Sequence, residues 1–147
     1  MNSVLVVCVG NVCRSPIAEA ILKDGLPEWS VASAGIHAAV GRDIDDTARS
    51  VAAAHGVRAP HREAQQFTAE LGTRYDLILI LEDRHKTEIV DIAPQLSGRI
   101  MRLSKWTGDK DIPDPYRKST EFHEAVFQRI SDAAAAWIER LAPKKAN

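Results

Sequence analysis

A cysteine and an arginine stand six residues apart in the segment CVGNVCRS, residues 8 to 15, which follows an apolar run. A loop that leaves a strand and enters a helix can point main-chain N–H groups inward to bind an anion, and the helix dipole adds positive potential. Gly10 and Asn11 tolerate the unusual backbone angles that such a loop needs. The guanidinium of Arg14 is a planar fork that can hold two phosphate oxygens at once. The segment is therefore predicted to bind phosphate through Val9, Gly10, Asn11, Val12, Cys13 and Arg14.

Cys8, at the start of this segment, has neighbours that favour ionisation of a thiol. A helix N-terminus, a nearby arginine and the hydroxyl of Ser15 each stabilise a thiolate. An ionised sulfur facing a bound phosphorus is a nucleophile, and Arg14 would hold the equatorial oxygens while charge redistributes. Without the arginine, a cysteine in an apolar strand is more typical of a small buried core residue. The pair therefore predicts catalysis with Cys8 as the nucleophile.

Asp114 is a second candidate catalytic residue and lies between two prolines in DIPDPYRKS, residues 111 to 119. Prolines fix backbone angles and lower the entropy lost when a carboxylate is held over a cleft. Such a carboxylate can protonate a leaving group and then activate the water that hydrolyses a cysteinyl-phosphate. Asp-Pro is also a common turn pair, so this segment alone leaves a turn role open.

Apolar runs and helical patterns alternate along the chain. Strands are expected over residues 3–9, 29–34, 75–81 and 99–103, and helices over about 15–25, 46–55, 83–93 and 119–141. This order predicts an α/β fold in one domain over residues 1–147, with a four-stranded, mainly parallel, twisted sheet and helices on both faces. Residues 143–147 are expected to be a frayed tail. Ligands bind at the carboxyl ends of strands in such sheets, and the CVGNVCRS segment falls there.

Local patterns also predict how individual side chains are used. Ser15 and Asp83 are suited to cap the helices that follow them. His55 and His85 are expected on helix surfaces, as are the charged side chains of Arg84, Lys86 and Glu88.

Composition and charge exclude several classes of protein. With 147 residues, 45% hydrophobic residues and a formal charge of −1, the chain has the balance of a globular domain and no basic excess for binding nucleic acid or a membrane surface. The first apolar run is too short for a secretory signal, and none reaches the roughly 18 apolar residues of a membrane span. A cytoplasmic protein is expected. Two cysteines make a poor zinc site, and no metal or cofactor is expected.

The residues Cys8-Val-Gly-Asn-Val-Cys-Arg-Ser15 and the distant Asp114-Pro-Tyr116 together resemble the low-molecular-weight protein tyrosine phosphatases. The resemblance covers almost the whole chain, because length, strand-helix order and the distance between the motifs agree. It implies phosphotyrosine hydrolysis with Cys8 as the nucleophile, Arg14 as the phosphate-binding residue and Asp114 as general acid and then base.

The resemblance also implies supporting roles. Ser15 matches the hydroxyl that stabilises the thiolate, and Asn11 matches the residue that holds the loop's strained shape in a hydrogen-bond network with Ser33 and His61. Tyr116 would form part of the rim that receives the substrate ring, although a packing role is equally open.

The second loop cysteine, Cys13, matches one that forms a reversible disulfide with the nucleophile in the family and protects it from further oxidation. Simple packing against the first helix is an equally open role for this side chain.

The segment WTGDKDIPDPYRKS, residues 106 to 119, most resembles the bacterial subgroup found with capsule or exopolysaccharide systems. That resemblance implies a phosphotyrosine protein as partner, namely a tyrosine autokinase, with no nucleic acid and no membrane insertion. Two departures separate the chain from eukaryotic members. Arg117 replaces a second tyrosine, and the loop over residues 37–40 lacks an aromatic wall, so recognition is expected to rely more on the peptide than on ring stacking.

Other functions are considered against the same residues. Arsenate reductases of this fold need cysteines further along the chain, and none follows Cys13. Protein arginine phosphatases carry a threonine where this chain has Val12. A non-catalytic phosphate-binding module would lack either Cys8 or Asp114, and both are present. Thiol redox sensing by Cys8 and Cys13 remains an alternative.

Overall fold

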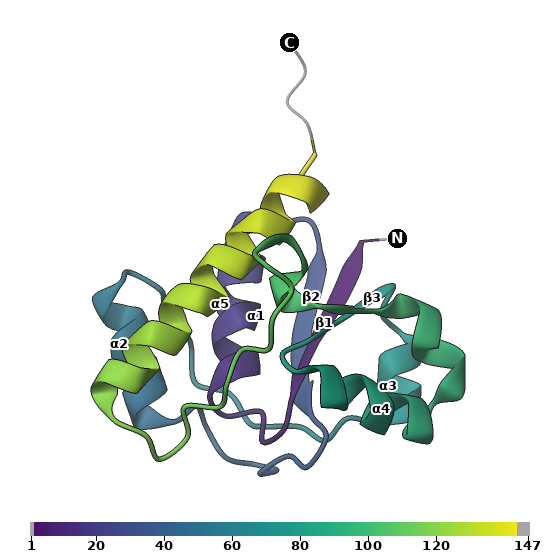
Figure 1. The fold of residues 1–147 in the computed structure, drawn as a ribbon, viewed down its shortest axis with the longest axis horizontal. Coiled ribbons are helices and arrows are strands. Elements are labelled where there is room, and N and C mark those ends of the chain that lie inside the picture. The colour runs from purple at the N-terminus through teal and green to yellow at the C-terminus, as the bar shows by residue number, and fades with distance from the viewer. Residues whose placement is uncertain (1, 144–147) are drawn as a thin grey trace.

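The computed structural model describes residues 2–143, which form one four-stranded sheet with helices on both faces (Figure 1). The strands are β1 (Ser3–Cys8), β2 (Ser30–Gly35), β3 (Leu77–Ile80) and β4 (Ile100–Arg102). The helices are α1 (Arg14–Gly25), α2 (Asp46–Ala54), α3 (Ala69–Thr73), α4 (Asp83–Ile92) and α5 (Thr120–Leu141), and two 3₁₀ segments are η1 (Pro94–Arg99) and η2 (Leu103–Trp106). No helix within residues 2–143 is long and apolar enough to cross a membrane.

The sheet is entirely parallel and has the strand order β2-β1-β3-β4, which confirms the predicted α/β fold. Three strands, β1, β3 and β4, are shorter than predicted, and β4 is shorter because the flanking 3₁₀ segments include Arg99 and Leu103. Of the predicted frayed tail, residues 144–147 lie outside the described part of the chain.

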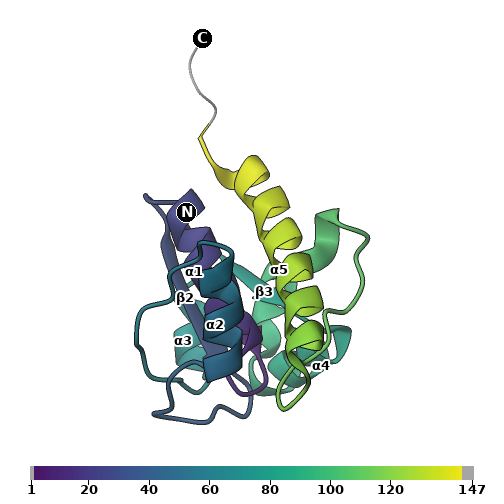
Figure 2. The same cartoon turned by 90° about the vertical axis from the view of Figure 1, so that its left-hand side faces the viewer.

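Two hydrophobic cores hold β1 at the centre of the sheet. Val4 and Val6 point into the core shared with α1, α2 and α5, while Leu5 and Val7 point into the core on the side of α3 and α4. Figures 1 and 2 show these two groups of helices on opposite sides of the sheet. Both faces of β1 are therefore buried, which explains its continuous apolar sequence.

The carboxyl end of β1 lies between its neighbours β2 and β3. Cys8, the last residue of β1, is in register with Gly35 at the end of β2, and Val7 is in register with Ile80 at the end of β3. The segment after Cys8 therefore begins at the sheet edge where parallel α/β proteins bind ligands.

Two helix starts differ from the sequence prediction. Helix α1 begins at Arg14, so Cys13 is its N-cap residue and makes no side-chain cap. Ser15 lies inside the helix, and its hydroxyl is hydrogen-bonded to the sulfur of Cys8. Glu82 rather than Asp83 caps α4, through a capping box in which the main-chain N–H of Glu82 donates to the Nδ1 of His85. His85 is consequently buried and not on the helix surface as predicted.

Gly35 has no room for a side chain, since a Cβ there would overlap the main-chain oxygen of Val9 and come within 3.0 Å of the Cα of Ala38. Because main chain cannot move aside as a side chain can, Gly35→Ala is expected to lower the free energy of unfolding by about 2 kcal/mol or more. Urea titration will measure this. Gly98→Ala is the matched control, since its Cβ would meet no atom within 4 Å, and equal stability of the two variants would contradict the prediction.

Candidate active site

The segment between β1 and α1 forms a tight loop around one strained residue. Asn11 lies in the left-handed region at φ 60°, which a short polar side chain tolerates. Gly10, predicted to share this role, is not in that region, and a Cβ there would make only an ordinary contact of 3.5 Å with Val12. The curvature of the loop therefore depends on Asn11.

Two donors face the buried sulfur of Cys8. The main-chain N–H of Asn11 donates to Sγ over 3.3 Å, and the Oγ of Ser15 lies 2.9 Å from Sγ. Ser15 Oγ already accepts a hydrogen bond from Asn11 Nδ2 at 2.8 Å. The hydroxyl hydrogen is thus available to the sulfur, an arrangement that stabilises a thiolate.

The orientation of the Asn11 amide follows from its other partners. Its Oδ1 accepts from the main-chain N–H of Gln65 at 3.0 Å and from the guanidinium of Arg62. Its Nδ2 must therefore be the donor to Ser15 and to Ser33 Oγ, 2.9 Å away. Ser33 in turn donates to Glu19 at 2.5 Å, so each polar atom of this network has a defined role.

The guanidinium of Arg14 is almost fully buried and only partly satisfied by the protein. Its Nη1 donates to Glu82 Oε2 at 2.6 Å and to the carbonyl of Ile112 at 2.8 Å. Its Nη2 has no hydrogen-bond partner and lies 3.8 Å from Asp114 Oδ2. One side of the group is thus held by the protein, while the other faces the cleft.

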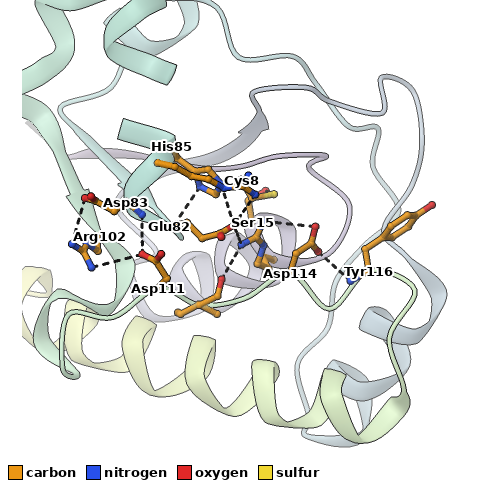
Figure 3. Close-up of polar contacts among 12 residues, drawn as sticks. Cys8, Ser15, Glu82, Asp83, His85, Arg102, Asp111, Asp114 and Tyr116 are labelled. Carbon is orange, nitrogen blue, oxygen red and sulfur yellow. Dashed lines mark hydrogen bonds and ion pairs between the residues drawn. The ribbon is translucent and has the colours of Figure 1, made fainter. Parts of the chain in front are cut away.

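A cleft of about 240 Å³ joins these groups, although they come from opposite ends of the chain. Figure 3 shows Cys8, Ser15, Glu82 and Asp114 converging, with Tyr116 at the outer edge. The cleft is lined by Cys8, Val9, Gly10, Val12, Cys13, Arg14, Ala39, Arg42, Asp114 and Tyr116. Asn11, Ser15 and Ser33 are buried and do not line the cleft, and the Nδ2 of Asn11 donates hydrogen bonds to both serine hydroxyls. No cluster of three or more His, Cys, Asp or Glu side chains in the described part of the chain could hold a metal.

Asp114 is the more exposed partner in the cleft, with 43% of its side chain accessible. Its Oδ1 accepts from the main-chain N–H of Tyr116 at 3.1 Å, which fixes the carboxylate in the turn. The Arg117 guanidinium lies 5.3 Å from the centre of the Tyr116 ring, and Arg117 itself has φ 62°. The turn therefore holds the Asp114 carboxylate in place, while the open cleft leaves it accessible to a ligand.

Cys13 lines the same cleft but differs from Cys8 in its electrostatics. Burial raises the pKa of the Cys13 thiol far above its ordinary value, and the negative charges of Asp45 and Asp114 add to this effect. The thiol therefore stays protonated at neutral pH, which excludes it as the nucleophile.

His61 is not in the network that the sequence predicted for it. Its ring bonds to Asp43 and is 87% exposed, with no contact to Asn11 or Ser33. The neighbouring Arg62 makes those contacts instead, because its longer side chain reaches both residues. No motif pointed to Arg62, since an arginine in a polar loop is ordinarily a surface residue.

Glu82 and His85 are two further residues of the site that sequence reasoning missed. Glu82 is half-buried, and although burial opposes ionisation, its hydrogen bond to Arg14 and the charge of Arg14 outweigh it and lower the pKa of the carboxyl. His85 Nε2 lies 3.3 Å from Glu82 Oε2, without hydrogen-bond alignment. The position of Glu82 two residues after the end of β3, at the carboxyl edge of the sheet, is the signal that could have revealed it.

Burial, and then the positive charge of Arg14, lower the pKa of His85 from 6.5 to about 4. Below pH 6.5 the unfolded chain binds a proton that the folded protein does not, so stability falls as the pH drops from 6.5 towards 4. We expect this histidine to account for on the order of 2 kcal/mol across that range, after allowance for solvent screening. Urea titrations from pH 7 to pH 4 will measure it.

In His85→Asn the loss of stability with falling pH is expected to be shallower than in the wild type. The matched control is His37→Asn, because His37 is 75% exposed. If both variants keep the wild-type slope, His85 is not the titrating group.

The sequence was compared with those of known proteins. Residues 3–147 match the family described as low molecular weight phosphotyrosine protein phosphatase. The chain is 47% identical over 140 residues to the low molecular weight protein-tyrosine-phosphatase Wzb of Salmonella typhimurium, covering 95% of this chain and 94% of that protein. It is 45% identical to Etp of Escherichia coli K12, which carries the same description, over 95% of each chain.

Among solved structures, Wzb of Vibrio vulnificus in complex with benzylphosphonate superposes with a TM-score of 0.92 at 44% identity, over 95% of this chain and 99% of that one. The chain belongs to the low molecular weight phosphotyrosine protein phosphatase family.

Proposed function

We propose that Cys8, Arg14 and Asp114 carry out phosphotyrosine hydrolysis through a cysteinyl-phosphate intermediate. The observation that supports this most is the buried Nη2 of Arg14, which has no hydrogen-bond partner and faces a cleft shared with the Cys8 sulfur and the Asp114 carboxylate. A buried cationic donor without a partner is costly unless a ligand completes its hydrogen bonds. A phosphate monoester supplies such oxygens, and the thiolate below supplies the nucleophile.

In the first step, the Cys8 sulfur attacks phosphorus as the bond from phosphorus to the tyrosine oxygen breaks. Asp114, protonated, transfers its proton to that oxygen, so neutral tyrosine leaves. The free edge of the Arg14 guanidinium and the inward N–H groups of the loop stabilise the equatorial oxygens.

The second step releases phosphate from sulfur. The Asp114 carboxylate now takes a proton from water, whose oxygen attacks phosphorus while the sulfur–phosphorus bond breaks. The products are inorganic phosphate, the Cys8 thiolate and a protonated Asp114, which is the starting state. No metal takes part in either step.

The substrate we propose is a phosphotyrosine protein in the cytoplasm, a bacterial tyrosine autokinase of a capsule or exopolysaccharide system. The bound benzylphosphonate of the Vibrio vulnificus relative is a small aromatic phosphonate, which supports an aryl phosphate as the group that enters the cleft. The likeness to Wzb and Etp supports a protein substrate. The segment WTGDKDIPDPYRKS, residues 106 to 119, supports the autokinase as the partner through its resemblance to the bacterial subgroup.

Tyr116 and Cys13 have proposed roles beside the reaction centre. Tyr116 lines the cleft, which supports its placement at the rim for the substrate ring. Cys13 lines the cleft together with Cys8, which supports a reversible disulfide that protects the nucleophile from overoxidation. Because the pKa of the Cys13 thiol is raised, an oxidised Cys8 would have to form the disulfide with a Cys13 thiol that is protonated.

The test is turnover of a phosphotyrosine peptide by the reduced protein with a chelator present, beside a phosphoserine peptide of the same sequence. We expect phosphate release from the phosphotyrosine peptide and little from the phosphoserine peptide. The serine alkoxide is a much poorer leaving group, and the serine side chain is too short to carry its phosphate to the cleft floor. Absence of turnover with phosphotyrosine would overturn the proposal.

A further inference from the structure

Arg62 is bonded directly to the phosphate-binding loop, although it does not line the cleft. Its Nη1 donates to the main-chain oxygen of Asn11 at 2.7 Å, and its Nη2 donates to Asn11 Oδ1 and, at 3.2 Å, to Ser33 Oγ. Asn11 is the one residue of the loop in a left-handed conformation. A single guanidinium thus bridges the main chain and the side chain of the most strained residue in the loop.

We propose that Arg62 is a positioning residue for catalysis, which fixes Asn11 so that the loop stabilises both the Cys8 thiolate and the bound phosphate. This inference rests on the proposed function. Arg62 acts through Asn11 and does not touch the substrate. Two consequences of its bridge, one in the main chain and one in the side chain, carry the argument.

The main-chain consequence concerns the peptide that joins Asn11 to Val12. In a planar trans peptide the C=O and N–H point in opposite directions. Arg62 holds the Asn11 carbonyl away from the cleft, so the N–H of Val12, a residue that lines the cleft, turns towards it. Arg62 thereby orients one of the donors that bind the phosphate oxygens.

The side-chain consequence concerns the hydroxyl that faces the nucleophile. Because Arg62 and the N–H of Gln65 both donate to Asn11 Oδ1, the amide cannot flip without placing two donors against its NH₂ group. The Nδ2 therefore stays bonded to Ser15, and the Ser15 hydroxyl stays directed at the sulfur. Loss of Arg62 would leave only the Gln65 N–H to prevent the flip.

The charge of Arg62 acts in the same direction. Burial lowers the pKa of its guanidinium, while the negative charges of Glu19, Cys8 and Asp43 oppose this, so the group stays a cation. An ionised Cys8 and Arg62 attract one another across the loop. Arg62 therefore adds its positive charge to that of Arg14 in the surroundings of the loop.

The experiment compares Arg62→Met, Arg62→Lys and the matched control Arg58→Met, since Arg58 is an exposed arginine four residues away in the same polar stretch. Two readouts are measured on each folded variant: kcat and KM for a phosphotyrosine peptide, and the pH midpoint of Cys8 alkylation by iodoacetamide. Mass spectrometry assigns the alkylated cysteine. Thermal unfolding establishes which variants are folded.

We expect Arg62→Met to lower kcat by about 10- to 100-fold with a smaller change in KM. We also expect its alkylation midpoint to rise by about one pH unit, because the thiolate loses an aligned hydroxyl and a nearby cation. Arg62→Lys keeps the charge but cannot bridge both Asn11 oxygens, so it should recover only part of each effect. It also carries the test should Arg62→Met fail to fold.

An alkylation midpoint and a kcat equal to those of Arg58→Met in both Arg62 variants would overturn the proposal. Full recovery of both readouts in Arg62→Lys would overturn the bridging role, since charge alone would then suffice. These outcomes are distinct from failure of the proposed function, in which the wild type and Arg58→Met would themselves be inactive.

Discussion

Cys8→Ser is expected to lower turnover of phosphotyrosine by about 10⁴-fold or more, the largest effect of any single substitution in this chain. Serine preserves the size and place of the side chain, but its hydroxyl stays protonated at neutral pH and cannot attack phosphorus without a base. No base is in place, because the polar contacts of Cys8 Sγ are the Asn11 N–H and the Ser15 hydroxyl. Phosphate release from a peptide under single-turnover conditions will measure the loss.

Binding and folding serve as controls for this variant. The loop N–H groups and Arg14 are untouched, so inorganic phosphate should still bind and thermal stability should stay near that of the wild type. An intact rate in a folded Cys8→Ser protein would show that the sulfur is not the nucleophile. The cleft would then have to be considered as an anion-binding site.

Asp114→Asn is expected to lower kcat for a phosphotyrosine peptide by about 10²- to 10³-fold. Without an acid, tyrosine would have to leave as a phenolate, whose conjugate acid has a pKa of about 10, so protonation of the leaving oxygen by Asp114 removes much of the barrier. An amide keeps the size of the carboxylate and its turn but has no acidic proton to give. The loss should be smaller for p-nitrophenyl phosphate, whose leaving group needs less help.

The dependence on the leaving group separates acid catalysis from mere damage to the cleft. A distorted cleft would slow both substrates equally, whereas a missing acid slows the poorer leaving group more. Equal loss for peptide and p-nitrophenyl phosphate would therefore contradict the assignment of Asp114. Lys118→Met is a suitable control, because Lys118 is an exposed residue of the same segment and does not line the cleft.

The fold and the placement of Cys8 and Arg14 at the carboxyl edge of the sheet could be predicted from the sequence because local signals dominate both. The continuous apolar run of β1 and the alternation of strands with helices determine a parallel sheet, and a parallel sheet determines where Cys8 and Arg14 must lie. The placement of Asp114 in the same cleft, 100 residues further on, could be expected only from the resemblance to a family. No pattern within its own segment links it to Cys8.

The missed features depend on which partner each side chain meets in the folded protein, whether that partner is near along the chain, as for Ser15 and His85, or distant, as for Arg62. Ser15 was predicted to cap its helix, but its hydroxyl is hydrogen-bonded to the sulfur of Cys8 instead. His85 was predicted on the surface, but it packs beneath the Glu82 main chain as part of a capping box. Arg62 takes the place predicted for His61 in the network around Asn11. The two residues, Arg62 and Asn11, are 51 positions apart in the sequence, so only tertiary packing determines that they meet.

The bond from Arg14 to the carbonyl of Ile112 ties two parts of the machinery together. Ile112 lies two residues before Asp114, so the guanidinium that we propose to bind phosphate also anchors the segment that carries the proposed acid. The effects of substitutions at Arg14 and Asp114 on activity are therefore expected to be non-additive. An exchange of the acid-bearing loop between relatives would succeed only if the donor loop brought a carbonyl to the same point, which makes that main-chain oxygen a constraint on how the enzyme can be re-engineered.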